Sequence, residues 1–158
     1  MASTQPLVDD LSAARAELFA ALDAVDPASL TTPGLLGAWS GRELIAHLGY
    51  WAGHAVEVIH AVEEGRIEEV GAGEPTADEV NETVARVARQ TDLAAVRKRE
   101  AASVEALVER LRRMDAGLLG LRLPDGATLE DGIREDGPDH YREHAAALRR
   151  TIGGGARD

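Results

Sequence analysis

The sequence predicts an all-α protein, a four-helix bundle. Its composition is rich in Ala, Leu, Glu and Arg, and aromatic residues make up only 3% of the chain, a balance that favours helices. Apolar residues also recur at spacings of three and four in four long segments, the pattern of amphipathic helices. Four such helices bury their apolar stripes by packing against each other. We therefore expect one bundle domain over residues 1–152 and a disordered C-terminal tail over residues 153–158.

The charge and the cysteine content exclude several classes of function. The chain has 28 acidic and 17 basic residues and a formal net charge of -11, which argues against binding to nucleic acid or to an anionic membrane. It has no cysteine, hence no disulfide, thiolate metal site or cysteine nucleophile. No apolar run is long enough to span a membrane, and Met1–Asp10 is acidic and polar rather than signal-like. The sequence thus favours a cytoplasmic protein.

The first two helices are marked by their apolar spacing and by a capping motif. The first runs from about Pro6 to Val25 and is followed by a loop rich in Pro and Gly. The second is announced by Ser40 and Glu43, which fit a capping box at a helix N-terminus. We expect this helix to continue to Gly65, a residue type that commonly ends helices.

The next long segment predicts a third helix whose continuity stays open. Thr76 and Glu79 form another capping box, and apolar residues follow at helical spacing. The pattern weakens between Thr91 and Glu100, so the segment is either one long helix or two helices broken near Thr91-Asp92.

The C-terminal part predicts a short helical piece and then the last main helix. Thr128 is placed to cap the short piece, which ends near Gly137. The last helix covers about Pro138 to Ile152, with the proline in its first turn.

Three histidines are the candidates for metal binding. His140 and His144 are four residues apart, so they share one helix face with Cβ atoms about 5–6 Å apart. His47 lies in the middle of the second helix, and together the three offer neutral nitrogen donors that leave at least one position open, as in catalytic sites. His54 lies about 10 Å from His47 along the helix axis and His60 falls on its far side, so neither joins this set. The alternative is a solvent-exposed histidine pair and a core histidine.

Four further residues are candidates for a pocket beside these histidines. Tyr50, Trp51 and Tyr141 flank the three histidines in sequence, and they either wall a pocket or pack in the core. His54 is placed to line the mouth of a cavity or to act as a base. The sequence assigns no catalytic residue.

Two histidine-bearing motifs resemble a known superfamily. The segment Trp39-Ser40-x-x-Glu43-Leu44-Ile45-Ala46-His47-Leu48-x-x-Trp51 looks like the second-helix motif of the DinB-like (YfiT-like) metalloproteins. His140-Tyr141-Arg142-Glu143-His144 resembles the C-terminal His-x-x-x-His of the same superfamily. Asp78-Glu79-Val80-Asn81 is similar to the start of the third helix in the ClbS/DfsB branch, the closest in pattern. The resemblance covers Leu7 to Ile152.

The resemblance implies a metal site and a class of chemistry. His47, His140 and His144 would hold a divalent metal, most often zinc or nickel. Members include S-transferases and isomerases that use mycothiol or bacillithiol, and resistance hydrolases acting on electrophilic natural products. We therefore expect a metal-dependent transferase or hydrolase that acts on a small electrophilic molecule, with a low-molecular-weight thiol as cofactor in the transferase case. The further C-terminal domain of the mycothiol-dependent maleylpyruvate isomerases has no counterpart here, so the broader class is expected rather than that activity.

Two alternatives remain beside the enzyme. One is a non-catalytic protein that binds or sequesters a small hydrophobic molecule in a cavity of the bundle. The other is a structural member with a vestigial site. Similar bundles form homodimers, so a homodimer is one expected state.

Overall fold

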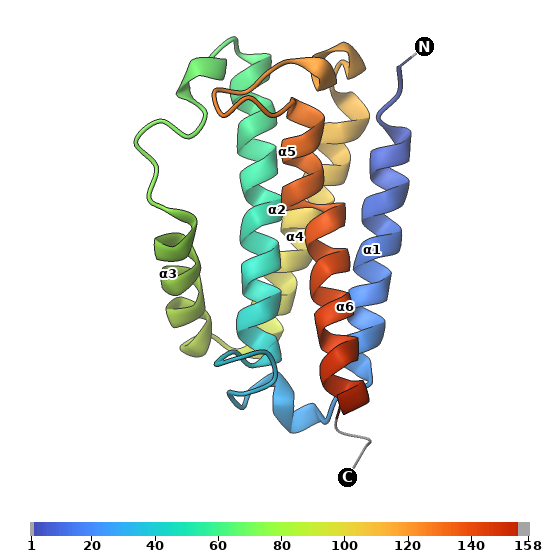
Figure 1. Cartoon of the computed structure of the whole chain (residues 1–158), viewed down its shortest axis with the longest axis vertical. Coiled ribbons are helices and arrows are strands. Elements are labelled where there is room, and N and C mark those ends of the chain that lie inside the picture. Colours follow the sequence, from blue (N-terminus) through green and yellow to red (C-terminus); the bar gives the residue numbers. More distant parts are fainter. Residues whose placement is uncertain (1, 155–158) are drawn as a thin grey trace.

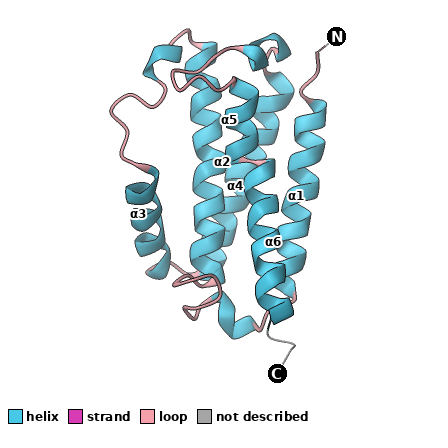
Figure 2. Cartoon of the chain, in the orientation of Figure 1, coloured by secondary structure: helices cyan, strands magenta, loops and turns pink. Residues whose placement is uncertain are grey.

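The bundle consists of four helical rods that run parallel or antiparallel to one another, and one further helix lies outside it (Figure 1). The computed structural model describes residues 2–154, and its regular elements in that range are helices joined by loops (Figure 2). The rods are α1 (Gln5–Asp23), α2 (Gly41–Glu63), α4 (Leu93–Arg113) and the consecutive pair α5 (Leu129–Asp136) and α6 (Pro138–Gly154). The outer helix is α3 (Ala77–Arg89). The predicted all-α four-helix bundle is confirmed.

In the view of Figure 1, α1 runs downwards, α2 and α4 run upwards, and α5 with α6 runs downwards again. α2 and α4 are therefore parallel neighbours, and the chain must return along the molecule between them. α3 lies on that return path and packs against α2 from outside. This crossover places α3 beside the N-terminal half of α2, which carries His47 (Figure 1).

The first two helices begin and end close to their predicted bounds. The Glu43 carboxylate accepts hydrogen bonds from the backbone N–H of Ser40 at 2.7 Å and from the Ser40 hydroxyl at 3.0 Å. Both residues are buried, so this cap anchors the start of α2 inside the bundle. α2 ends at Glu63, and Gly65 follows with a positive φ of 75°, a conformation that favours glycine.

The third predicted segment forms two helices, which settles the question left open by the sequence. α3 starts after the Thr76–Glu79 capping box and ends at Arg89, and α4 starts at Leu93. Ala85 and Ala88 are the two buried residues of α3. Because its buried side chains are so small, α3 covers α2 rather than contributing to the core.

The last rod is broken at Gly137. A Cβ at this position would lie 2.9 Å from the carbonyl oxygen of Ile133, so only glycine allows the close approach that joins α5 to α6. α6 continues to Gly154 and so includes two residues, Gly153 and Gly154, that were predicted to belong to the tail. Residues 155–158 of the predicted tail lie outside the described residues.

A buried ionic network lies in the core between α1, α4 and α6. Glu100 of α4 is 1% exposed and accepts two hydrogen bonds of 2.7 Å from the Arg15 guanidinium. The Tyr141 hydroxyl donates a third, also of 2.7 Å. These bonds offset the cost of removing the carboxylate from water, so the network fixes how the three helices pack.

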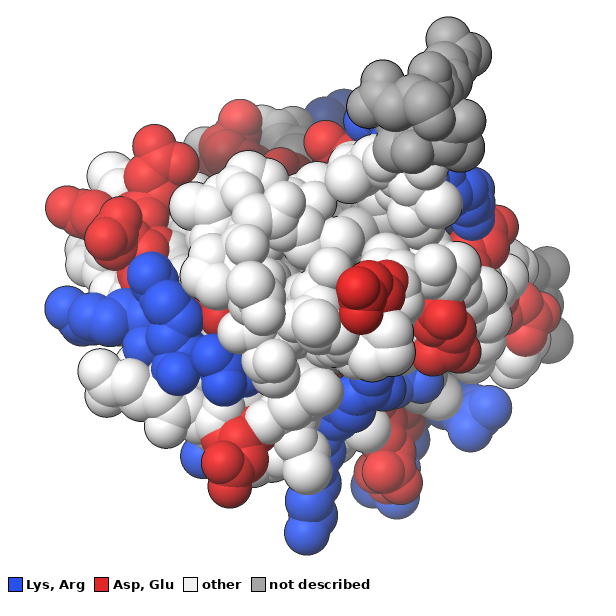
Figure 3. Space-filling view, turned by 90° about the horizontal axis from the view of Figure 1, so that it is seen from below, with Lys and Arg blue, Asp and Glu red and all other residues white. Residues whose placement is uncertain are grey.

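The described surface carries mixed charges. Seen from below, acidic and basic side chains are interspersed around a largely uncharged area, so no continuous basic surface covers the coloured part of this face (Figure 3). Within residues 2–154, no helix combines the length and the apolar character needed to cross a membrane.

Candidate metal centre

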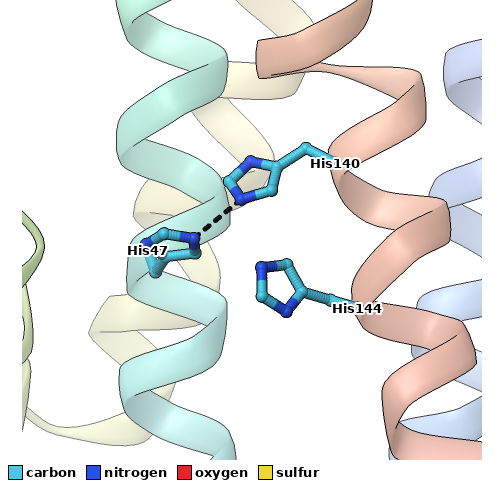
Figure 4. Close-up of side chains that lie close together, drawn as sticks. All are labelled: His47, His140 and His144. Carbon is cyan, nitrogen blue, oxygen red and sulfur yellow. Dashed lines mark hydrogen bonds between the residues drawn. The ribbon is translucent and has the colours of Figure 1, made fainter. Parts of the chain in front are cut away.

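His47 of α2 meets His140 and His144 of α6 in the space between the two helices (Figure 4). The Nε2 atoms of His47 and His140 are 2.7 Å apart, and each of the three residues offers a ring nitrogen within 4.8 Å of the others. His47 is only 6% exposed, whereas His140 and His144 are half-buried. The structure thus brings together the three predicted histidines in a cluster whose two members from α6 are partly exposed.

Burial keeps the three imidazoles neutral. It lowers the pKa of His47 from 6.5 to about 4, with a smaller contribution from the charge of His144 and an opposing hydrogen bond to Asn81. The pKa of His140 is lowered to about 3, by burial first and then by the charges of His47 and His144. Burial also lowers the pKa of His144. All three are therefore in the form that binds metal ions at neutral pH.

The chemistry of this donor set fits a divalent metal. Three neutral nitrogen donors converge, and their number leaves a position open for another ligand. The Nδ1 atom of His140 is buried and has no hydrogen-bond partner among the residues that the structure describes. Imidazoles bind zinc, nickel, copper and iron. The three histidines therefore indicate a transition metal ion without distinguishing among these elements.

Asn81 of α3 contacts His47, at the ring nitrogen that faces away from His140. Its side-chain Oδ1 lies 3.1 Å from Nδ1 of His47 and accepts a hydrogen bond of 2.9 Å from the Trp51 indole N–H. Sequence reasoning did not assign Asn81 a role. The available signal was a polar residue on the face of α3 that also carries Val80 and Val84.

His54 belongs to a second, neighbouring cluster. Its Nδ1 atom lies 2.7 Å from a carboxylate oxygen of Asp136, and its ring packs at 5.0 Å from the Trp51 ring. The hydrogen bond to Asp136 raises the pKa of His54, and burial raises the pKa of Asp136. Within the described part of the chain, Nε2 of His54 is buried without a hydrogen-bond partner, although the Glu74 carboxylate lies 3.5 Å away. His60, by contrast, is exposed on the far side of α2 and paired with Glu64.

Two cavities border this region. The larger, about 700 Å³, lies between α2, α3 and α4, and the smaller, about 300 Å³, lies between α2, α5 and the adjoining loops. Trp51, His54 and Glu74 line both. Tyr50 lines the larger cavity and is 42% exposed. Three of the four predicted pocket residues, Tyr50, Trp51 and His54, are therefore at a cavity wall.

The prediction that Tyr141 lines a pocket is wrong. Tyr141 follows His140 by one residue, about 100° around the helix, and this rotation turns it towards α1 and α4. It is 0% exposed, its hydroxyl is bonded to Glu100, and it borders neither of the two cavities among the described residues.

The comparisons with known proteins agree with this fold. The sequence matches the family "Mycothiol maleylpyruvate isomerase N-terminal domain" over residues 11–135, a range that includes His47 and ends before His140. No curated protein matches the chain. A solved structure described as "Crystal structure of the mycothiol-dependent maleylpyruvate isomerase" is similar, with a TM-score of 0.66 and 19% sequence identity.

That similarity covers 94% of this chain and 63% of the isomerase chain, so the chain spans less than two thirds of the isomerase it matches. At this identity, the likeness supports the fold. The DinB-like (YfiT-like) superfamily expected from the histidine motifs is confirmed, whereas the likeness to the ClbS/DfsB branch stays a prediction. The chain belongs to the family of mycothiol maleylpyruvate isomerase N-terminal domains.

Proposed function

We propose that this protein is a metal-dependent enzyme that directs a small thiol, or water, against a small electrophilic molecule. The observation that carries the proposal is the cluster of three neutral histidines contributed by α2 and α6, two of which are partly exposed. A divalent metal bound there, with zinc or nickel as the leading candidates, would supply a Lewis acid that lowers the pKa of a thiol or water.

Different residues would bind the metal and transfer protons at such a site. His47, His140 and His144 would hold the metal, and their burial keeps protons from competing for the ring nitrogens at neutral pH. His54 is oriented by Asp136 and would exchange protons with a substrate in either neighbouring cavity. A histidine held by a carboxylate is a suitable general acid or base.

The thiol is the favoured nucleophile because of the family to which the chain belongs. Its name refers to mycothiol, and the similar solved structure is of a mycothiol-dependent enzyme. We infer that mycothiol or bacillithiol serves as the thiol and that the reaction is an S-transfer or a thiol-assisted isomerisation. Hydrolysis is the corresponding reaction with water.

A second candidate function is non-catalytic binding of a hydrophobic small molecule. The larger cavity favours it, because about 700 Å³ falls within the range of ordinary ligand pockets. Its walls include Trp51, Val80, Val84 and Val96, so a ligand with an apolar body would fit.

Metal analysis tests the leading proposal. We expect purified protein to contain about one zinc or nickel ion per chain and the variants His47→Ala, His140→Ala and His144→Ala to lose it. The matched control is His60→Ala, which removes an exposed histidine of α2 and should retain the metal. Wild-type protein that takes up no divalent metal would refute the proposal. Protein that binds metal but consumes no thiol with any of a panel of electrophiles would favour the binding function instead.

A further inference from the structure

The hydrogen bonds of Asn81 determine the orientation of its amide. The Trp51 indole nitrogen can only donate, and it lies 2.9 Å from one atom of the Asn81 amide. That atom must therefore be the oxygen, since the NH₂ group would bring two donors together. Trp51 thus fixes which end of the amide faces α2.

The orientation of Asn81 in turn determines the tautomer of His47. The same amide oxygen lies 3.1 Å from Nδ1 of His47, and an oxygen of this kind can only accept. Nδ1 must therefore carry the hydrogen. Because a neutral imidazole carries one N–H, the lone pair is on Nε2, the atom that faces Nε2 of His140 at 2.7 Å.

We propose that Asn81 is a positioning residue for the metal centre, which holds His47 as the Nδ1–H tautomer so that its Nε2 lone pair points into the histidine cluster. Trp51 supports this role by preventing the amide from turning. This role rests on the proposed function only in that a metal ion binds to the histidine cluster. The tautomer of His47 is a property of the metal-free protein.

This arrangement makes an outer helix part of the metal centre. Partners that orient a metal-binding histidine typically contribute a factor of about 10–100 to metal affinity. Here the partner comes from α3, whose two buried residues are Ala85 and Ala88. The affinity of the cluster therefore depends on a residue that lies outside the four-helix core.

Nuclear magnetic resonance of the protein without added metal tests the tautomer directly. The ¹⁵N chemical shifts of the His47 ring distinguish a protonated Nδ1 from a protonated Nε2. We expect the Nδ1–H form in the wild type and in Asn81→Asp, which keeps an acceptor oxygen of the same reach. Asn81→Ala should show a mixture or the Nε2–H form, and Trp51→Phe an intermediate effect because the amide is then free to turn.

Zinc affinity, measured by competition with a chromophoric chelator, is the second readout. Asn81→Ala should raise the Kd for Zn²⁺ about 10–100-fold, while Asn81→Asp should stay close to the wild-type value. The matched control is Glu82→Ala, because Glu82 is the exposed neighbour of Asn81 on α3 and should leave both readouts unchanged.

The two readouts separate failure of this inference from failure of the proposed function. If the wild type takes up no zinc but shows the Nδ1–H form that is lost in Asn81→Ala, the function fails and the positioning role stands. A wild-type Nε2–H tautomer overturns the inference, as does an Asn81→Ala variant with unchanged tautomer and affinity. Should Asn81→Asp lose the tautomer as fully as Asn81→Ala, the acceptor oxygen is not the cause and the inference is again wrong.

Discussion

Acidification of the metal-free protein should destabilise it through His47. This side chain is 6% exposed, and burial lowers its pKa from 6.5 to about 4. Between these two values the unfolded chain binds a proton that the folded chain does not, so the free energy of unfolding falls as the pH falls. The contribution is fully present above the unfolded pKa and is lost as the pH approaches the folded pKa.

The loss of stability can be calculated from the difference between the pKa of His47 in the unfolded and the folded protein. With about 1.36 kcal/mol for each pKa unit of difference, lowering the pH from about 7.5 to about 4.5 should remove about 2–3 kcal/mol through His47. That is a substantial part of the total stability of a typical domain, about 5–15 kcal/mol. The other carboxylates and histidines of the chain add their own pH dependence, so the effect must be isolated by a variant.

His47→Gln isolates it, because glutamine keeps an N–H donor near Asn81 and does not titrate. Urea unfolding of both chelator-treated proteins at the two pH values gives the free energies of unfolding. The wild type should lose about 2–3 kcal/mol more than the variant. The removal of His47 also takes away one of the charges that lower the pKa of His140. The free energy of unfolding of the variant therefore depends still less on pH. Two pH profiles that run parallel would show that His47 is not held in its neutral form by burial.

Two further predictions concern the packing that positions the site. Gly49→Ala would place a Cβ 2.9 Å from Cα of Glu100 and should cost about 1–3 kcal/mol by urea unfolding. Gly53→Ala, with its nearest atom 3.6 Å away, should be neutral or stabilise α2 by up to about 1 kcal/mol; equal losses in both variants would contradict the close approach of α2 and α4. Tyr141→Phe removes a donor to Glu100 and should cost about 1–3 kcal/mol, whereas exposed Tyr50→Phe should change stability by less than about 0.5 kcal/mol. A Tyr141→Phe variant as stable as the wild type would show that the network does not depend on this hydroxyl.

Local signals made the helix starts predictable. The capping boxes at Ser40 and Thr76 depend on residues three positions apart, and both form as expected. The meeting of His47 with His140 and His144 was also predictable in outline. Residues on the apolar faces of two helices in one bundle point towards the same interior, so helical periodicity alone could suggest their proximity.

The remaining features depend on tertiary packing that a single sequence does not encode in a readable way. The placement of α3 outside the bundle decides that Asn81 contacts His47, whereas the local sequence shows only a polar residue on the face that carries Val80 and Val84. Tyr141 was misplaced for a related reason. Its helical position is one residue from His140, and whether that direction faces a cavity or the core depends on where α1 and α4 lie.

The position of α3 links two binding events, because the helix borders both the larger cavity and the histidine cluster. Its residues wall the larger cavity, and through Asn81 it orients His47. A ligand in the cavity and a metal at the histidines would therefore both favour the docked helix. By thermodynamic reciprocity, each would strengthen the binding of the other by the same factor. Hydrogen exchange of the α3 amides reports this coupling, because either ligand should slow exchange in α3 while leaving the buried middle of α2 unchanged.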